Sequence, residues 1–338
     1  MKLYGGIDLH SNNSVIALLS EEDKVVYRRR LPNDLEIVLG ELAPFRDAIE
    51  GLVVESTYNW YWLVDGLMEA GYRVHLANTA AIVQYEGLKY ADDDSDARWL
   101  AKLLRLGLLP EGYIYPKEER PVRDLLRKRS QLVRQRTSNL QSIQNLLARN
   151  RGHSLGANEI KRLTYEGVDR LLPDANLALA VKGTLAVMRT LDGVIDLLEK
   201  AIKGRIKLRP AFKPLLTVSG IGQILGLTIM LETGEIGRFA QVSNYASYCR
   251  CVDSKRITNG KKKGKGNRKN GNKYLAWAYV EAANYAVRYN DTIKRYYQRK
   301  CARTHPIVAT KTVAHKLARA CYYILRDQVS FDVNKAFA

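Results

Sequence analysis

A long helical pattern in the middle of the chain limits the fold more than any other feature. From Val122 to Asn150 the sequence contains neither Pro nor Gly, and its apolar residues recur at intervals typical of one helical face. A second helical stretch from Leu177 to Lys203 can pack antiparallel against it. The pair predicts a helical hairpin or coiled-coil arm for dimerisation or for holding nucleic acid. The alternative is a plain long helix packed on a domain.

The segment before this pattern predicts a mixed α/β sheet. A meander of strands is expected near residues 3–10, 15–19 and 24–28, with connecting loops rich in Asn and Ser. Further strands are expected at 49–55 and 73–77, with helices at 35–42, 59–70 and 94–105. A meander followed by strands that alternate with helices is typical of a mixed α/β sheet.

The segment after the arm predicts a second compact unit that is mainly helical. Leu216–Gly234 resembles a helix-hairpin-helix element, because its Gly-Ile-Gly turn exposes backbone N–H groups at the start of a helix. A simple structural turn explains the same spacing. The expected divisions are therefore an α/β domain over 1–120, a helical arm over 121–205 and a mainly helical domain over 206–338.

The charge balance points to a polyanionic partner. The 338 residues include 54 Lys and Arg against 35 Asp and Glu, a formal net charge of +19. Phosphates neutralised by such an excess release condensed counterions, which favours nucleic acid. No apolar run is long enough to span a membrane and no signal peptide is evident, so a cytoplasmic protein is expected.

A glycine-rich basic segment from Lys255 to Lys273 concentrates part of this charge. The segment has no acid, cannot bury itself, and contains glycines that allow a ligand to approach the backbone closely. A solvated loop is the simpler interpretation, but charge of one sign favours contact with nucleic acid. The residues expected to make that contact are Lys255, Arg256, Lys261, Lys262, Lys263, Lys265, Arg268, Lys269 and Lys273.

The four cysteines do not indicate a zinc site. Cys249 and Cys251 are two apart, a spacing atypical of zinc ligands, while Cys301 and Cys321 stand alone. We expect reduced thiols packed in a core.

Acids at strand ends form the candidate chemical site. Asp8 and Glu55 each follow an apolar strand, and Asp93 and Asp96 share one face at the start of a helix. Four converging carboxylates could bind two hard cations for phosphodiester cleavage. The structural alternative for neighbours such as Asp92 or Asp94 is a helix cap.

Several motifs together resemble the DEDD transposases of bacterial insertion sequences, to which Piv-type DNA invertases are related. The N-terminal blocks are Gly-Ile-Asp, Val-Glu-Ser-Thr and Asp-x-x-Asp-Ala-Arg. The C-terminal blocks are Val-Ser-Gly-Ile-Gly, Tyr-Ala-Ser-Tyr-Cys, Asn-Gly-Lys-Lys-Lys-Gly and Lys-Asn-Gly-Asn-Lys-Tyr-Leu. Each block is weak alone, but together they follow the family's order over nearly the whole chain.

The resemblance implies more than the spacing does. It implies a RuvC-like ribonuclease H fold for the N-terminal domain, with Mg²⁺ on Asp8, Glu55, Asp93 and Asp96. It also implies a C-terminal transposase domain whose serine attacks DNA to form a covalent intermediate. Family members form homodimers or homotetramers, and the insertion-sequence branch uses a structured noncoding bridge RNA to select donor and target DNA.

The chain departs from the family at the expected nucleophile. Thr258 stands where the family has Ser before the Asn-Gly-Lys-Lys-Lys-Gly block. A threonine hydroxyl can attack phosphorus, but its methyl group crowds the pentacoordinate centre. Ser254 is the other hydroxyl within reach.

Three functions follow as hypotheses. The first is an RNA-guided transposase with Thr258 as nucleophile, and the second is a Piv-like invertase without a guide RNA. The third is a catalytically silent nucleic-acid-binding protein.

Overall fold

The chain folds into two compact units. The computed structural model describes residues 1–82, 93–205, 209–252, 256–264 and 270–337. One unit contains residues 1–117 together with 254–270, and the other contains residues 118–253 together with 271–338.

A mixed five-stranded sheet forms the centre of the first unit. Its strands are β1 (Leu3–Leu9), β2 (Asn13–Ser20), β3 (Val25–Pro32), β4 (Ile49–Glu55) and β5 (Val74–Ala77), in the order β3-β2-β1-β4-β5. The first three strands form an antiparallel meander, and β4 and β5 continue parallel to β1. The expectation of a mixed α/β sheet is therefore confirmed.

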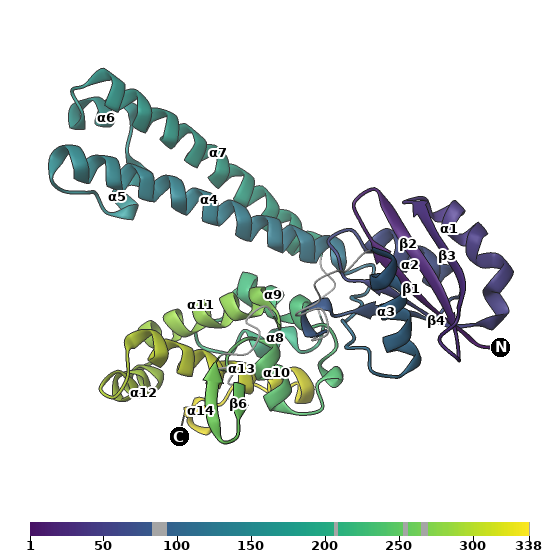
Figure 1. Ribbon diagram of the computed structural model, residues 1–338. Helices are drawn as coiled ribbons and strands as arrows, with labels where there is room; N and C mark the ends of the chain where they lie inside the picture. The colour runs from purple at the N-terminus through teal and green to yellow at the C-terminus, as the bar shows by residue number, and fades with distance from the viewer. Residues whose placement is uncertain (83–92, 206–208, 253–255, 265–269, 338) are drawn as a thin grey trace. The chain divides into compact units, whose positions relative to one another are not determined.

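Helices cover both faces of this sheet (Figure 1). On one face, Ile7, Ile16 and Val54 pack against α1 (Leu35–Leu42) and α2 (Tyr61–Glu69). On the other, Val53 packs with α3 (Asp93–Arg105), and Val15 and Ala17 contact Ala97 of α3. Two short 3-10 turns, η1 (Ala43–Ala48) and η2 (Thr79–Ala81), lie in the connections. Because side chains alternate along a strand, residues 6 and 8 of β1 face α3.

The packing of α3 on the sheet depends on Gly6. A Cβ added at this position would lie 1.9 Å from the carbonyl oxygen of Ala97 and 2.7 Å from the nitrogen of Ala101. Both atoms belong to the backbone of α3, so no side-chain rotation can relieve the clash. The absence of a side chain at Gly6 brings the start of α3 close to the end of β1.

The second unit begins with a helical hairpin. α4 (Arg120–Arg151) and α7 (Ala175–Arg205) lie antiparallel along one another, with α5 (Ala157–Arg162) and α6 (Tyr165–Leu171) at their far end (Figure 1). Ile143 and Leu147 of α4 pack with apolar residues of α7 that include Val181. Two ion pairs, Arg129–Glu199 and Arg136–Asp192, also join the helices. The two long helices expected from the sequence are present and extend slightly beyond the expected ranges.

The remainder of the second unit is a helical core. Its elements are α8 (Phe212–Leu215), α9 (Gln223–Thr233), η4 (Ile236–Arg238), α10 (Val242–Tyr248), α11 (Lys273–Tyr289), α12 (Asp291–Cys301), α13 (Pro306–Asp327) and α14 (Val333–Phe337). Tyr245 and Tyr279 are fully buried in it, and their hydroxyls lie 2.6 Å apart. Burial raises the pKa of both phenols well above the ordinary value, so both stay neutral.

The cysteines are free thiols, as expected. Cys249 and Cys321 are buried in this helical core, and Cys251 and Cys301 are partly exposed. Among the described helices, none has the length and apolar character needed to cross a bilayer.

Substitution of Gly6 by Ala tests the packing of α3. We expect Gly6→Ala to lower the free energy of unfolding by at least the ~1–3 kcal/mol typical of overpacking, because the new methyl group meets backbone atoms. Gly40→Ala is the matched control, since Gly40 lies in α1 with no atom near its added Cβ. That change should stabilise by roughly 0.5–1 kcal/mol. Urea unfolding measures both, and equal effects would contradict the close approach.

Candidate functional site

The strand register brings two of the expected acids together. β1 and β4 pair in parallel with Ile7 opposite Val54, so Asp8 and Glu55 are neighbours at the carboxyl ends of these strands. Asp8 is buried, and its carboxyl group shares a hydrogen bond with that of Glu55. Both side chains lie on the face of the sheet that α3 covers, as expected from the alternation along the strands.

A third acid reaches the same place from α3. Burial, the hydrogen bond with Asp8 and repulsion from the charges of Asp8 and Asp96 raise the pKa of Glu55 to about 8. Asp96, in the first turn of α3, lies close enough to Glu55 for its charge to contribute to this shift. Asp93 is the first residue of α3, but its side chain lies outside the described residues.

His10 is a further member of this site that the sequence reasoning missed. Its Nε2 atom lies 3.3 Å from Oδ2 of Asp8. The side chains of Asn33 and Asn59 each donate a hydrogen bond to the carbonyl oxygen of His10, at 2.9 Å. The Asp-x-His spacing could have indicated it, because residues two apart in extended backbone face the same way.

The oxygen-rich donor set fits a hard divalent cation. Carboxylates that converge without a cation repel one another, and the raised pKa of Glu55 reflects that repulsion together with burial. Carboxylate oxygens are the preferred protein ligands of Mg²⁺. Among the described residues, no group of three His, Cys, Asp or Glu side chains has the geometry of an assembled metal site.

The basic segment contains a β-hairpin. β6 (Arg256–Thr258) pairs antiparallel with β7 (Lys261–Gly264), and Thr258 stands opposite Lys261. Asn259 and Gly260 connect the strands with φ values of 50° and 72°, the left-handed conformation that an Asn-Gly hairpin turn requires. No hairpin was expected from the sequence in this glycine-rich segment, and the Asn-Gly turn places Thr258 at the end of a strand, where it is exposed.

The structure describes part of the expected basic surface. Lys261 and Lys263 are exposed on β7, and Lys273 is exposed at the start of α11. The side chains of Arg256 and Lys262 lie outside the described residues, although their backbones belong to the hairpin. Also outside the described residues are Ser254, Lys255, Lys265, Arg268 and Lys269.

Contacts between Tyr248 and Asn272 close the base of the basic excursion, the segment between these two residues that contains the hairpin. The N–H of Asn272 donates to the carbonyl oxygen of Tyr248 at 2.6 Å. The guanidinium of Arg250 donates to the carbonyl oxygen of Gly271 at 2.9 and 3.2 Å. Gly271 has a φ of 83°, and a Cβ there would lie 2.5 Å from the oxygen of Tyr248. The chain therefore leaves and re-enters the helical core at one point.

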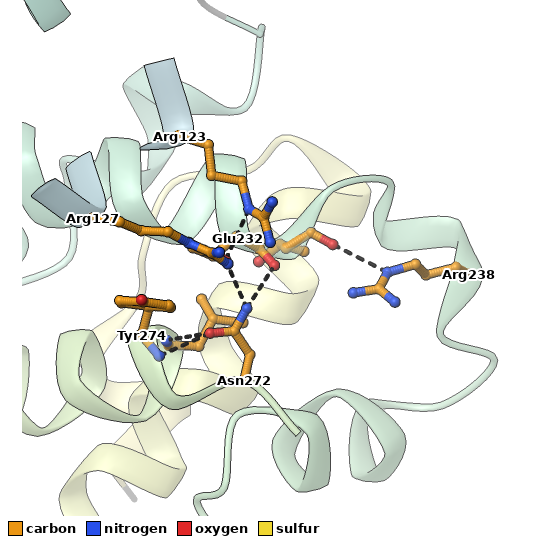
Figure 2. Close-up of polar contacts among 8 residues, drawn as sticks. Arg123, Arg127, Glu232, Arg238, Asn272 and Tyr274 are labelled. Atoms are coloured by element: carbon orange, nitrogen blue, oxygen red, sulfur yellow. Dashed lines mark hydrogen bonds and ion pairs between the residues drawn. The ribbon is translucent and has the colours of Figure 1, made fainter. Parts of the chain in front are cut away.

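A buried carboxylate fixes this re-entry point (Figure 2). The carboxylate of Glu232, on α9, accepts two hydrogen bonds from Arg127 at 2.6 and 2.8 Å and one from Arg123 at 3.1 Å. The side-chain amide of Asn272 donates to the same carboxylate at 2.8 Å. The amide oxygen of Asn272 also caps α11 by accepting from the N–H groups of Tyr274 and Leu275. Glu232 thus joins the N-terminal end of α4 to the N-terminal end of α11.

The charge of Glu232 is compensated by its partners. Burial alone would raise its pKa, but the hydrogen bond from Arg127 and the charges of Arg123 and Arg127 outweigh burial and lower it. Sequence reasoning missed this residue as well. The available signal was a single carboxylate within the apolar helix Gln223–Thr233, since a buried acid needs a partner.

Comparisons with known proteins agree on one family. A family model described as a transposase, of the DEDD IS110 group, matches residues 5–150. A second model, described as the transposase IS116/IS110/IS902 family, matches residues 213–298. A Pseudomonas aeruginosa protein named "Probable family 20 transposase" is 24% identical over 340 residues, which cover 96% of this chain and 97% of that protein.

The raised pKa of Glu55 predicts a specific dependence of stability on pH. Without metal, the folded state holds a proton on Glu55 up to about pH 8, whereas the unfolded state releases it near the ordinary value of 4.5. This contribution is therefore present below pH 4.5 and is lost as pH rises toward about 8. Urea unfolding in EDTA should show the loss, and Mg²⁺ should reduce it by binding the ionised carboxylates.

Glu55→Gln provides the control, because a neutral amide cannot titrate. The difference between the native and variant unfolding free energies should change over that pH range and be smaller in Mg²⁺. A difference that is independent of both pH and Mg²⁺ would contradict the carboxylate cluster.

The hairpin lysines should set part of the salt dependence of DNA binding. Replacing Lys261, Lys262 and Lys263 with Gln should reduce the log–log salt slope by up to about 0.9 for each phosphate contact that is lost. The control replaces Lys2, Lys102 and Lys117, which pair with Glu50, Asp23 and Glu69. Fluorescence anisotropy over a salt series measures the slopes. Equal slopes for native protein and hairpin variant would mean that the hairpin does not contact DNA.

Proposed function

Because the chain belongs to the IS110-type family of DEDD transposases, we propose that it cuts and exchanges DNA strands by a metal-dependent reaction through a covalent protein–DNA intermediate. Membership of this family makes the protein a DNA-recombining enzyme with DNA as its substrate. Family membership alone does not specify the mechanism, the catalytic residues or a guide RNA, and these are part of the proposal.

The observation that carries the proposal is the convergence of Asp8, Glu55 and Asp96. They come from two adjacent strand ends and one helix start, and burial together with the charges of Asp8 and Asp96 raises the pKa of Glu55. Three acids gathered beside the sheet, with burial and like charge raising the pKa of Glu55, support a cation-binding role, because buried like charges are costly unless an opposite charge compensates them. A bound cation would supply that opposite charge.

The proposed roles follow from the chemistry of each side chain. Asp8, Glu55, Asp93 and Asp96 would hold Mg²⁺. Bound ions would neutralise charge that develops on the phosphate oxygens. The hydroxyl oxygen of Thr258 would form a bond to phosphorus while the leaving DNA oxygen departs with the hydroxyl proton, which gives a phosphothreonine and a free DNA hydroxyl. Lysines of the hairpin would neutralise the flanking phosphates.

We assign a RuvC-like ribonuclease H fold to the catalytic domain, residues 1–120. In its support, a three-stranded meander continues into two parallel strands, with acids on the adjacent central strands β1 and β4. Residues 121–205 would form the coiled-coil arm, and residues 206–338 the transposase domain with its helix-hairpin-helix-like turn between α8 and α9.

A bridge RNA is proposed as the guide that selects donor and target DNA. The Arg-rich helix α4, in which Asp124 is the single acid, offers charge for such a partner. Sequencing RNA that copurifies with the protein separates this proposal from a Piv-like invertase, which needs no guide. Metal-dependent cleavage that is lost on carboxylate substitution separates both from a silent nucleic-acid-binding protein.

Self-association through the arm is also proposed. The outer face of α7 is apolar or small at a seven-residue repeat, and Leu179 and Leu197 on it are 69% and 65% exposed. The repeat consists of Ala180, Gly183, Val187, Thr190, Val194, Leu197, Ala201 and Gly204. A seven-residue repeat matches a partner helix of the same period, so a second copy of α7 is the expected occupant, within a homodimer or homotetramer.

Substitutions at Thr258 test the nucleophile. Thr258→Ser should raise the rate of adduct formation, because it removes the crowding methyl group and keeps the oxygen. Thr258→Ala should abolish the adduct and spare RNA binding. Trapped protein–DNA adducts mapped by mass spectrometry give the answer. An adduct on Ser254, or one that persists in Thr258→Ala, would refute the assignment.

Charged substitutions on α7 test the arm. Val187→Glu with Val194→Glu should shift the sedimentation coefficient toward the monomer, because carboxylates in a helix–helix interface lose hydration. Arg189→Glu with Lys200→Glu changes charge outside the repeat and serves as the control. A monomeric native protein, or an unchanged oligomer in the first variant, would exclude this face as the interface.

A further inference from the structure

A basic cavity lies between α13 and the C-terminal segment of the second unit. Its volume is about 880 Å³, within the range typical of small-molecule sites. His315, Lys316 and Arg319 line it from one face of α13, and Lys335 lines it from α14. These residues belong neither to the carboxylate cluster nor to the basic hairpin.

The positive charge of this cavity is not balanced by its acids. Asp327 pairs with Arg326 at 2.7 Å. Asp332 accepts hydrogen bonds from the backbone N–H groups of Asn334 and Lys335, at 2.9 and 3.2 Å. Within the described part of the chain, no carboxylate forms an ion pair with His315, Lys316 or Arg319. Lys316 donates to the neutral carbonyl oxygen of Ala336 at 2.8 Å, which leaves its charge in place.

Burial and neighbouring positive charges lower the pKa values of two residues of this cavity, and a bound anion would raise them. Burial, followed by the charges of Arg319 and Lys316, lowers the pKa of His315. Burial and the charges of Lys300 and Arg319 lower the pKa of Lys316. Basic side chains on an open surface extend into water and away from one another. Here His315 and Lys316 are half-buried and adjacent. An anion between them would favour their charged forms.

An aromatic ring stands next to the cations. Tyr323 lines the same cavity and is 40% exposed, and the guanidinium of Arg326 lies 5.0 Å from the centre of its ring. Arg319 and Tyr323 are four residues apart on α13, so they lie on one face about 6 Å apart along the helix axis. A phosphate held at Arg319 therefore leaves a base within reach of a stacking surface.

We propose that this cavity binds one nucleotide, with its phosphate on His315, Lys316 and Arg319 and its base against Tyr323. The nucleotide could belong to a nucleic-acid strand or be free in solution, and both sources present the same chemistry. This site stands apart from the strand-cleavage reaction, so binding can be measured whether or not the protein cuts DNA.

Histidine NMR of the full chain tests the site directly. The protein contains five histidines, and His315→Gln identifies the resonance of His315 in protein labelled at histidine Cε1. Inorganic phosphate, a nucleoside monophosphate and a single-stranded tetranucleotide are titrated separately. Saturable shifts of His315, without matching shifts of His153 or His305, are expected with the nucleotide ligands. Tighter binding of the tetranucleotide than of the monophosphate would identify a strand as the source, and the reverse order a free nucleotide.

Two substitutions complete the test. Arg319→Gln should weaken binding of the nucleoside monophosphate about tenfold, as expected for the loss of one charge-assisted hydrogen bond. Arg303→Gln, at an exposed arginine in the turn before α13, should leave it unchanged. The proposal is overturned if no ligand shifts His315 saturably, or if both variants bind like the native protein.

Discussion

The contact between the backbone of α3 and β1 at Gly6 is the constraint on which the candidate active site depends. Parallel pairing of β1 with β4 places Asp8 beside Glu55, but this pairing alone yields only two acids. The third comes from α3, whose start lies over the strand ends because Gly6 has no side chain to hold the helix away. A hydrogen atom in place of a methyl group therefore determines whether the carboxylates form one cluster.

Two buried glutamates show how surroundings decide the state of the same side chain. Glu55 lies among acids, so burial and repulsion raise its pKa. Glu232 is more deeply buried, yet Arg127 and Arg123 lower its pKa. The first arrangement brings like charges together, and in the second the charge is compensated by arginines of the protein itself. Acidification therefore has opposite effects on the two arrangements: it favours the one around Glu55, and it weakens the one around Glu232 by removing the charge that binds the arginines.

The parts of the structure that depend on local pattern could be predicted from the sequence. The strands that carry Asp8 and Glu55, the long helices of the arm and the free thiols follow from periodicity and spacing. Long-range contacts could not be predicted in this way. The bond between Glu232 and Asn272 joins residues 40 positions apart, and Arg127 is 105 positions from Glu232. The hairpin around Thr258 was missed for a different reason, because charge and glycine content outweighed the Asn-Gly turn signal.

The closed base of the basic excursion makes it a separable module of the fold. Tyr248 and Asn272 are joined through backbone atoms, and Arg250 and Gly271 complete the closure, so it does not depend on the identity of residues 254–270. The entropy of closing such a loop changes only slowly with its length. Changes of length within residues 254–270 would therefore leave the helical core nearly unaffected. The position of the segment proposed to attack DNA is therefore set by contacts outside that segment.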